Sequence, residues 1–226
     1  MPVYQLSEEF IFPHPQQAEP NGLLAVGGDL SPRRLLTAYA AGIFPWYNEG
    51  SPILWWSPDP RLVLFPQEFK RHKNLRRLVK SGKFRVTFNH DFPRVIKACS
   101  QVKRKGQTGT WITPAMQQAY LRLHQLGFAL SVECYLDDVL AGGLYGVILG
   151  KVFFGESMFH TVTDASKVAL WHLVDRLLEK QFTVIDVQQD TPHLRSLGAR
   201  LISREHFLFL LKENIPAEII ISSRLP

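Results

Sequence analysis

The stretch Phe-Phe-Gly-Glu-Ser-Met-Phe at residues 153–159 places one acidic residue, Glu156, among apolar side chains. A charge in such surroundings is costly unless a partner or a ligand compensates it. Further along the chain, Val184-Ile185-Asp186-Val187-Gln188 is a second apolar run that carries an acid and an amide. If the two runs are neighbouring strands, Glu156, Asp186 and Gln188 converge beside an apolar wall, as in a ligand-binding cavity. The alternative is two ordinary core strands with a buried ion-pair partner elsewhere in the chain.

The elements around these two runs follow from turn signals and apolar periodicity. Three strands joined by short turns, expected over residues 128–135, 139–149 and 151–158, predict antiparallel hairpins. A long amphipathic helix is expected from Asp164 through Lys180, and after it come a strand over 183–187, a helix opened by Thr191-Pro192, a strand over 200–202 and a helix over 204–211. This order is typical of the GNAT-like acyltransferase fold.

The first half of the chain has a different composition. Ser31-Pro32 predicts the start of a helix that ends at Gly42. The aromatic and proline-rich run from Ile43 to Arg61 predicts a rigid lobe without regular elements. A basic helix over 67–83, a strand over 84–88 and helices over 91–99 and 113–126 follow. We therefore predict an α+β fold in which a small N-terminal domain, residues 1–62, packs on a GNAT-like domain, residues 63–226, with a mainly antiparallel sheet.

Composition excludes several classes of protein. No apolar run reaches the ~18 residues that a membrane span needs, and Glu8 and Glu9 stand where a signal peptide would be basic. Two cysteines in 226 residues are too few for a disulfide framework, which predicts a reduced, cytoplasmic protein. The histidines and cysteines lack metal-ligand spacing, so we expect no metal. Nothing in the sequence predicts an obligate oligomer, and we expect a monomer.

The net charge of +6 is unevenly distributed. Residues 70–105 hold thirteen of the 26 Lys and Arg residues and one acid, whereas both flanking segments are net acidic. The cationic residues form two clusters, Lys70, Arg71, Lys73, Arg76, Arg77 and Lys80, and then Lys103, Arg104 and Lys105. A patch of this kind attracts a polyanion, most often a nucleic acid. The alternative is a solvated helix face with no partner.

Two enzymatic signatures are incomplete. Gly155-Glu156-Ser157-Met158-Phe159 lacks the closing glycine of a nucleophile elbow. An enzyme that uses coenzyme A would hold the pyrophosphate with a glycine-rich loop before its long helix, and residues 160–166 contain no glycine. We therefore expect no coenzyme A and no other cofactor, while acyl transfer stays open.

Several motifs together resemble the leucyl/phenylalanyl-tRNA–protein transferase family over nearly the whole chain. They are residues 20–24 (Pro-Asn-Gly-Leu-Leu), 27–32 (Gly-Gly-Asp-Leu-Ser-Pro), 42–46 (Gly-Ile-Phe-Pro-Trp), 53–61 with the highly specific Trp-Trp-Ser-Pro-Asp-Pro-Arg, 109–113, 155–159 and 196–199. The resemblance implies an enzyme that moves Leu or Phe, and less readily Met, from aminoacyl-tRNA to the N-terminal Arg or Lys of a protein. The product would be marked for degradation by the N-degron route.

The resemblance also implies roles for individual residues. Asp186 and Gln188 would be catalytic, and Glu156 would bind the acceptor. Tyr39 and Trp46 would hold the terminal adenosine of the tRNA, and the two basic clusters would bind its phosphates. The side-chain pocket would include Trp111, Phe153, Met158, Ile185, Leu144, Leu173 and Leu177. Leu144 stands where the family can have methionine, and Leu173 and Leu177 where it can have aromatic residues, and such changes can retune selectivity.

Two other functions stay open. One is an N-acetyltransferase that uses acetyl-coenzyme A, which calorimetry with coenzyme A would reveal. The other is a non-catalytic RNA-binding protein, which the basic segment favours but which gives no reason for Glu156, Asp186 and Gln188 in apolar strands.

Overall fold

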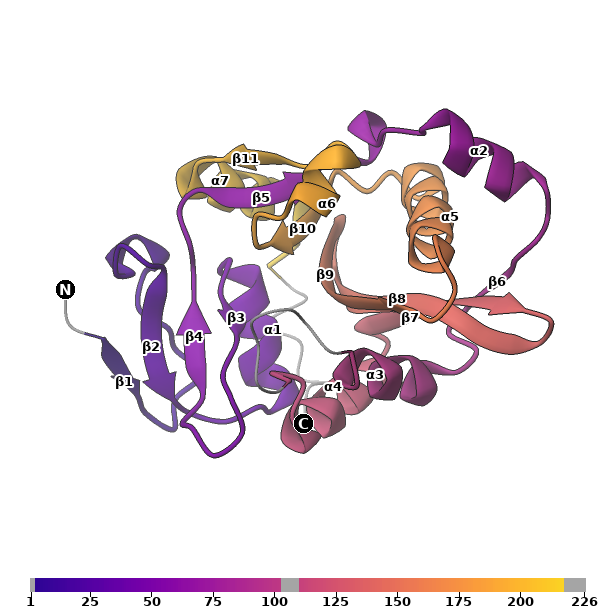
Figure 1. The fold of residues 1–226 in the computed structure, drawn as a ribbon. Helices are drawn as coiled ribbons and strands as arrows, with labels where there is room; N and C mark the ends of the chain where they lie inside the picture. The colour runs from indigo at the N-terminus through magenta and orange to yellow at the C-terminus, as the bar shows by residue number, and fades with distance from the viewer. Residues whose placement is uncertain (1–2, 103–109, 218–226) are drawn as a thin grey trace.

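The computed structural model describes residues 3–102 and 110–217 and contains two sheets (Figure 1). The smaller sheet has the order β1-β2-β4-β3. Its strands are β1 (Tyr4–Leu6), β2 (Leu23–Gly27), β3 (Phe44–Pro45) and β4 (Leu54–Trp56), and helix α1 (Pro32–Ala40) connects β2 to β3. The expectation that the aromatic run has no regular elements is wrong, because β4 pairs with both β2 and β3.

The larger sheet has seven strands in the order β11-β5-β10-β9-β8-β7-β6. They are β5 (Arg61–Leu64), β6 (Arg85–Phe88), β7 (Ala129–Leu136), β8 (Val139–Leu149), β9 (Val152–His160), β10 (Val184–Gln188) and β11 (Arg200–Ile202). All neighbouring strands are antiparallel except β9 and β10, which are parallel. The predicted hairpins, the crossover helix and the predominantly antiparallel α+β architecture are thus confirmed.

Helices cover both faces of the larger sheet (Figure 1). Helix α5 (Ala165–Glu179), with α2 (Lys73–Lys80) beside it, packs on one face, and α3 (Phe92–Ser100) and α4 (Pro114–Gln125) pack on the other. Two short helices, α6 (Pro192–Ser196) and α7 (Arg204–Asn214), flank β11, and single 3-10 turns occupy Pro15–Gln17 and Pro66–Glu68. The predicted helix starts are confirmed at Ser31 and Thr113, whose hydroxyls accept the backbone N–H groups of Arg34 and Met116.

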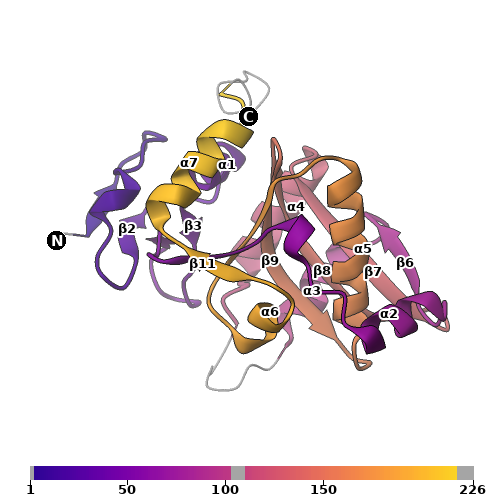
Figure 2. The ribbon, with the colours of Figure 1, turned by 90° about the horizontal axis from the view of Figure 1, so that it is seen from above.

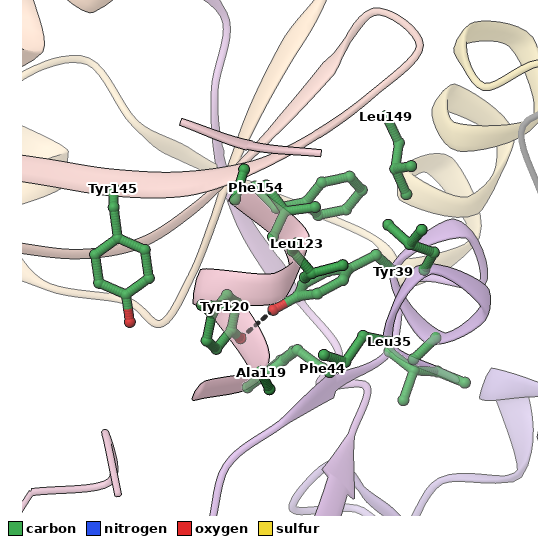
Figure 3. Packing of buried hydrophobic residues seen from close by; sticks show 14 of the residues in the cluster. Leu35, Tyr39, Phe44, Ala119, Tyr120, Leu123, Tyr145, Leu149 and Phe154 are labelled. Atoms are coloured by element: carbon green, nitrogen blue, oxygen red, sulfur yellow. Dashed lines mark hydrogen bonds between the residues drawn. The ribbon is translucent and has the colours of Figure 1, made fainter. Parts of the chain in front are cut away.

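One hydrophobic core joins the two sheets. Leu35 and Tyr39 of α1 pack with Tyr120 of α4 and Phe154 of β9 (Figure 3). The predicted boundary between residues 62 and 63 falls within β5, a strand of the larger sheet. The division into two domains stays a prediction.

Two β-bulges distort the sheet where β9 and β10 stop pairing. The parallel pairing ends at Phe154 and Asp186. Opposite β8, the register passes from Gly155 to Ser157, so Glu156 is the extra residue of one bulge. Opposite β5, it passes from Asp186 to Gln188, so Val187 is the extra residue of the other. Bulges of this kind re-aim side chains next to active sites.

Candidate active site

A cavity of about 360 Å³ opens where β9 and β10 separate. Its lining includes nine residues that the sequence predicted for the site, namely Trp46, Trp111, Leu144, Phe153, Glu156, Met158, Leu173, Ile185 and Gln188. It also includes Phe44, Pro45, Tyr145, Gly155, Ser157, Leu170, Val187, Gln189, Thr191, His193 and Leu194, which the sequence analysis did not select. The cavity therefore draws on both sheets and on helices α5 and α6.

One end of the cavity is apolar. Its lining there consists of Leu144 of β8, Phe153 of β9, Ile185 of β10, and Leu170 and Leu173 of α5, which belong to one buried hydrophobic cluster. All five side chains are buried in the protein, so they are held rigidly by packing. This end can take an apolar side chain without exposing new hydrophobic surface to water.

Leu177 is not among the described lining residues of this cavity. It lies one turn beyond Leu173 on α5 and is buried in the core cluster that also holds Leu173. Its place in the substrate pocket stays a prediction.

Glu156 is the acidic group of the cavity. Its two carboxylate oxygens accept hydrogen bonds from the hydroxyls of Tyr39 at 2.7 Å and Tyr120 at 2.8 Å. Burial raises the pKa of the Glu156 carboxyl to about 7, although the two tyrosine hydrogen bonds act in the opposite direction. The negative charge of Asp186 raises this pKa further, and the positive charge of Arg61 lowers it. At neutral pH the group can therefore either hold or accept a proton.

Tyr39 has a different place from the one expected. It is fully buried between α1 and the larger sheet, packs against the ring of Phe154, and is not part of the cavity lining. It therefore has no free ring face on which a nucleobase could stack. Trp46, the second residue expected to hold adenosine, does line the cavity and packs edge-on against Trp56.

Asp186 is held by a buried arginine. Its carboxylate forms a bidentate ion pair with Arg61, with both N–O distances 2.8 Å, and neither side chain is more than 1% exposed. The guanidinium of Arg61 lies between the rings of Phe44 and Phe207. Asp186 is not among the described lining residues of the cavity. The alternative of a buried ion-pair partner thus applies to Asp186.

Asp186 also contacts the backbone of Gln188. Its Oδ1 accepts the backbone N–H of Gln188 at 3.1 Å. Gln188 has a φ of 54°, in the left-handed region that a residue with a Cβ adopts only when its surroundings impose it. Its side-chain Nε2 is buried and has no hydrogen-bond partner among the described residues. Gln188 as a whole residue lines the cavity.

The basic segment lies beside the cavity but does not form its wall. Lys70, Lys73, Arg76, Arg77 and Lys80 are exposed, and Arg71 pairs with Asp175 of α5 at 2.5 Å. In both views α5 lies between α2 and α6, which lines the cavity (Figures 1 and 2). Lys103, Arg104 and Lys105 lie outside the described residues.

Besides the cavity-lining residues named above, Arg61 and Tyr120 were not selected from the sequence, although they contact Asp186 and Glu156. Arg61 stands in the specific Trp-Trp-Ser-Pro-Asp-Pro-Arg motif, and it is the only cation between residues 35 and 69, which could have marked it as a partner for a buried acid. Tyr120 falls within the helix expected over 113–126, and nothing in the helical spacing distinguishes its hydroxyl. Across residues 3–102 and 110–217, no group of three or more potential ligands could hold a metal ion. Over the same residues, no helix is long and apolar enough to span a membrane.

Comparisons with known proteins identify the family of this chain. A family model described as leucyl/phenylalanyl-tRNA protein transferase matches residues 63–212, and the model of that family's N-terminal domain matches residues 28–59. Proteins named leucyl/phenylalanyl-tRNA–protein transferase include one of Syntrophobacter fumaroxidans, 60% identical over 96% of this chain and 92% of its own length. Another, of Maridesulfovibrio salexigens, is 56% identical over 94% of this chain and 89% of its own length.

Solved structures give a more distant likeness. A GCN5-related N-acetyltransferase from Kribbella flavida matches with a TM-score of 0.39 and 10% identity, over 75% of this chain and 60% of its own. The two family models and the high identity of full-length relatives decide the assignment. The chain belongs to the leucyl/phenylalanyl-tRNA–protein transferase family, whose members transfer an aminoacyl group from tRNA to a protein.

Proposed function

We propose that this enzyme transfers Leu or Phe, and less readily Met, from aminoacyl-tRNA to proteins that begin with Arg or Lys. The transfer would mark the acceptor for N-degron degradation in the cytoplasm, and the enzyme would act as a monomer. The observation that carries the proposal is a single cavity whose one end is apolar and whose other groups include Glu156 and the amide of Gln188. The apolar end of the cavity suits an apolar aminoacyl side chain, and the polar groups suit the cationic N-terminus of the acceptor.

The reaction is aminolysis of an ester that is already activated. The enzyme therefore needs no covalent intermediate, and it gains most from holding the amine against the ester carbonyl, an effect that reaches about 7–11 kcal/mol in the best cases. The Gln188 amide is too weak a base to keep a proton. We assign its carbonyl oxygen to orient the incoming amine. Asp186 supports this arrangement through the Gln188 backbone.

The direct test is a transfer assay. The protein is incubated with leucyl-tRNA and a peptide that starts with Arg, and the mass of the peptide is measured. The proposal expects a mass increase of one leucine residue, and it expects no increase with a peptide whose N-terminal amine is acetylated. An unchanged mass of the free peptide, with the leucyl-tRNA still charged, would contradict the proposed function.

The choice of aminoacyl group should depend on the space beside Leu173. We expect Leu173→Phe, which fills the apolar end of the cavity, to lower transfer of Phe relative to Leu about 10-fold or more, because excess volume in an apolar pocket costs ~1–3 kcal/mol. The measurement is a competition between leucyl-tRNA and phenylalanyl-tRNA. Leu177→Phe is the matched control, since it enlarges a buried leucine of the same helix that is not among the described lining residues of the cavity. An equal change of the ratio in both variants would remove Leu173 from the specificity pocket.

The exposed cations of α2 should bind tRNA phosphates. We expect the triple variant of Arg76, Arg77 and Lys80 to glutamine to weaken tRNA binding at low salt and to reduce the slope of log affinity against log salt by about 2–3, since each phosphate contact contributes roughly 0.7–0.9. A control triple variant changes the exposed Arg33, Lys180 and Lys212, which lie on other elements. A slope that α2 neutralisation leaves unchanged would exclude this placement of the tRNA.

A further inference from the structure

Two buried tyrosines bracket the carboxylate of Glu156. Tyr39 comes from α1 and Tyr120 from α4, and both are fully buried. Each hydroxyl donates to a different oxygen of Glu156. The oxygens of the two hydroxyls also lie in contact with each other, as Figure 3 shows, but each hydroxyl has a single proton, so this contact has no donor while both hydroxyls donate to Glu156. Three elements that are distant in the chain thus fix one carboxylate, which is the arrangement expected of a group whose orientation matters.

The carboxylate keeps capacity for a ligand. An ionised carboxylate offers about four acceptor positions, and the two tyrosines occupy one on each oxygen. Glu156 lines the cavity, so its free positions are open to a molecule bound there. The bulge at Glu156 is what turns this side chain out of the regular alternation of β9.

Other titratable and charged groups around Glu156 come from six elements. Tyr39 and Tyr120 donate to it, and Tyr145 of β8 interacts electrostatically with both tyrosines. Asp186 of β10 raises the pKa of Glu156, and Arg61 of β5 lowers it. The two side chains form an ion pair with each other. His193 of α6 is the remaining titratable side chain in the described lining of the cavity.

We propose that Glu156 accepts the proton from the α-amine of the acceptor, and that Tyr39 and Tyr120 are positioning residues that keep it ionised and aimed. This inference rests on the proposed function. The neutral amine attacks the ester carbonyl, the new C–N bond forms, and the proton passes from nitrogen to Glu156. As the bond from the carbonyl carbon to the ribose oxygen breaks, the same proton moves to that oxygen. Glu156 returns to its ionised form, and the products are an amide and a free ribose hydroxyl.

The hydrogen bonds from the tyrosines determine the pH at which this step works. A donor stabilises the ionised carboxylate and lowers its pKa, so removing a donor raises the pKa. Below its pKa Glu156 already carries a proton and cannot accept another. Loss of either hydroxyl should therefore move the acidic limb of the pH–rate profile to higher pH.

The test compares Tyr39→Phe, Tyr120→Phe and Glu156→Gln with the wild type. Infrared titration follows the protonated-carboxyl band of Glu156, which is assigned by its disappearance in Glu156→Gln. We expect a midpoint near pH 7 in the wild type and a midpoint about one pH unit higher in each tyrosine variant, since a hydrogen bond to a charged group is worth about that much. The pH midpoint of the single-turnover transfer rate, measured at saturating peptide, should shift in parallel with the infrared midpoint.

Tyr135→Phe is the matched control, because it removes a tyrosine hydroxyl on β7 that faces Glu133 and Asp91 instead. It should leave both midpoints unchanged. Glu156→Gln should slow transfer about 100-fold or more and abolish the acidic limb that belongs to this group. No transfer by the wild type at any pH would overturn the proposed function. Transfer by the wild type with midpoints that neither tyrosine variant moves, or a full rate in Glu156→Gln, would overturn this inference alone.

Discussion

Replacing Arg61 with methionine is expected to lower the free energy of unfolding by about 3–5 kcal/mol, because it leaves a buried carboxylate without its partner. Both charged groups are almost completely buried, and two hydrogen bonds of 2.8 Å join them. The measurement is denaturant unfolding at pH 7. Arg85→Met is the control, since Arg85 forms an exposed ion pair with Asp138 and should show little measurable change.

A double variant separates the ion pair from simple loss of packing. If the uncompensated charge causes the loss in Arg61→Met, then adding Asp186→Leu should restore most of the stability, because a buried ion pair can be replaced by apolar groups at little cost. Transfer should stay impaired, since the Gln188 N–H would lose its acceptor. If the losses in unfolding free energy of the two single variants simply add in the double variant, the assigned role of the ion pair is contradicted.

Removing the Gln188 amide is expected to slow the chemical step about 100-fold or more, the size of effect seen when one preorganised polar contact is lost. Gln188→Gly is the preferred variant, because glycine accepts the φ of 54° without strain. Single-turnover transfer at saturating peptide measures the effect. We expect the rate constant to fall, with a small change in KM.

Gln189→Ala provides the comparison, since Gln189 also lines the cavity but is exposed. Its single-turnover rate constant should stay within a few-fold of the wild-type value. Near-normal chemistry in Gln188→Gly with only a raised KM would show that the amide binds the acceptor without taking part in the step. The same outcome in Asp186→Asn would likewise reduce Asp186 to a structural role.

The sequence predicted local structure well where a single residue determines it. Ser31 and Thr113 cap their helices in the expected way, and short turns correctly predicted the strands β7, β8 and β9. The strand β4 was missed because its three residues depend on two partner strands that its own composition does not reveal.

The site was predicted as a set of residues but not as a set of contacts. Glu156 and Gln188 meet in one cavity as expected, because β9 and β10 are neighbours. Arg61 and Asp186 are 125 residues apart, and no local pattern links them. The place of Tyr39 follows from the rotation of α1 against the larger sheet, which periodicity alone cannot distinguish from a ring that faces a ligand.

The most direct test of the proposed aminoacyl-binding cavity is a crystal structure of the protein with a leucyl adenosine in which an amide replaces the ester. We expect the leucine side chain to lie between Leu144, Leu173 and Ile185. The carbonyl carbon of the leucyl group should face the gap between Glu156 and Gln188. A leucine side chain bound outside this cavity, or a carbonyl directed away from both polar groups, would contradict the proposal.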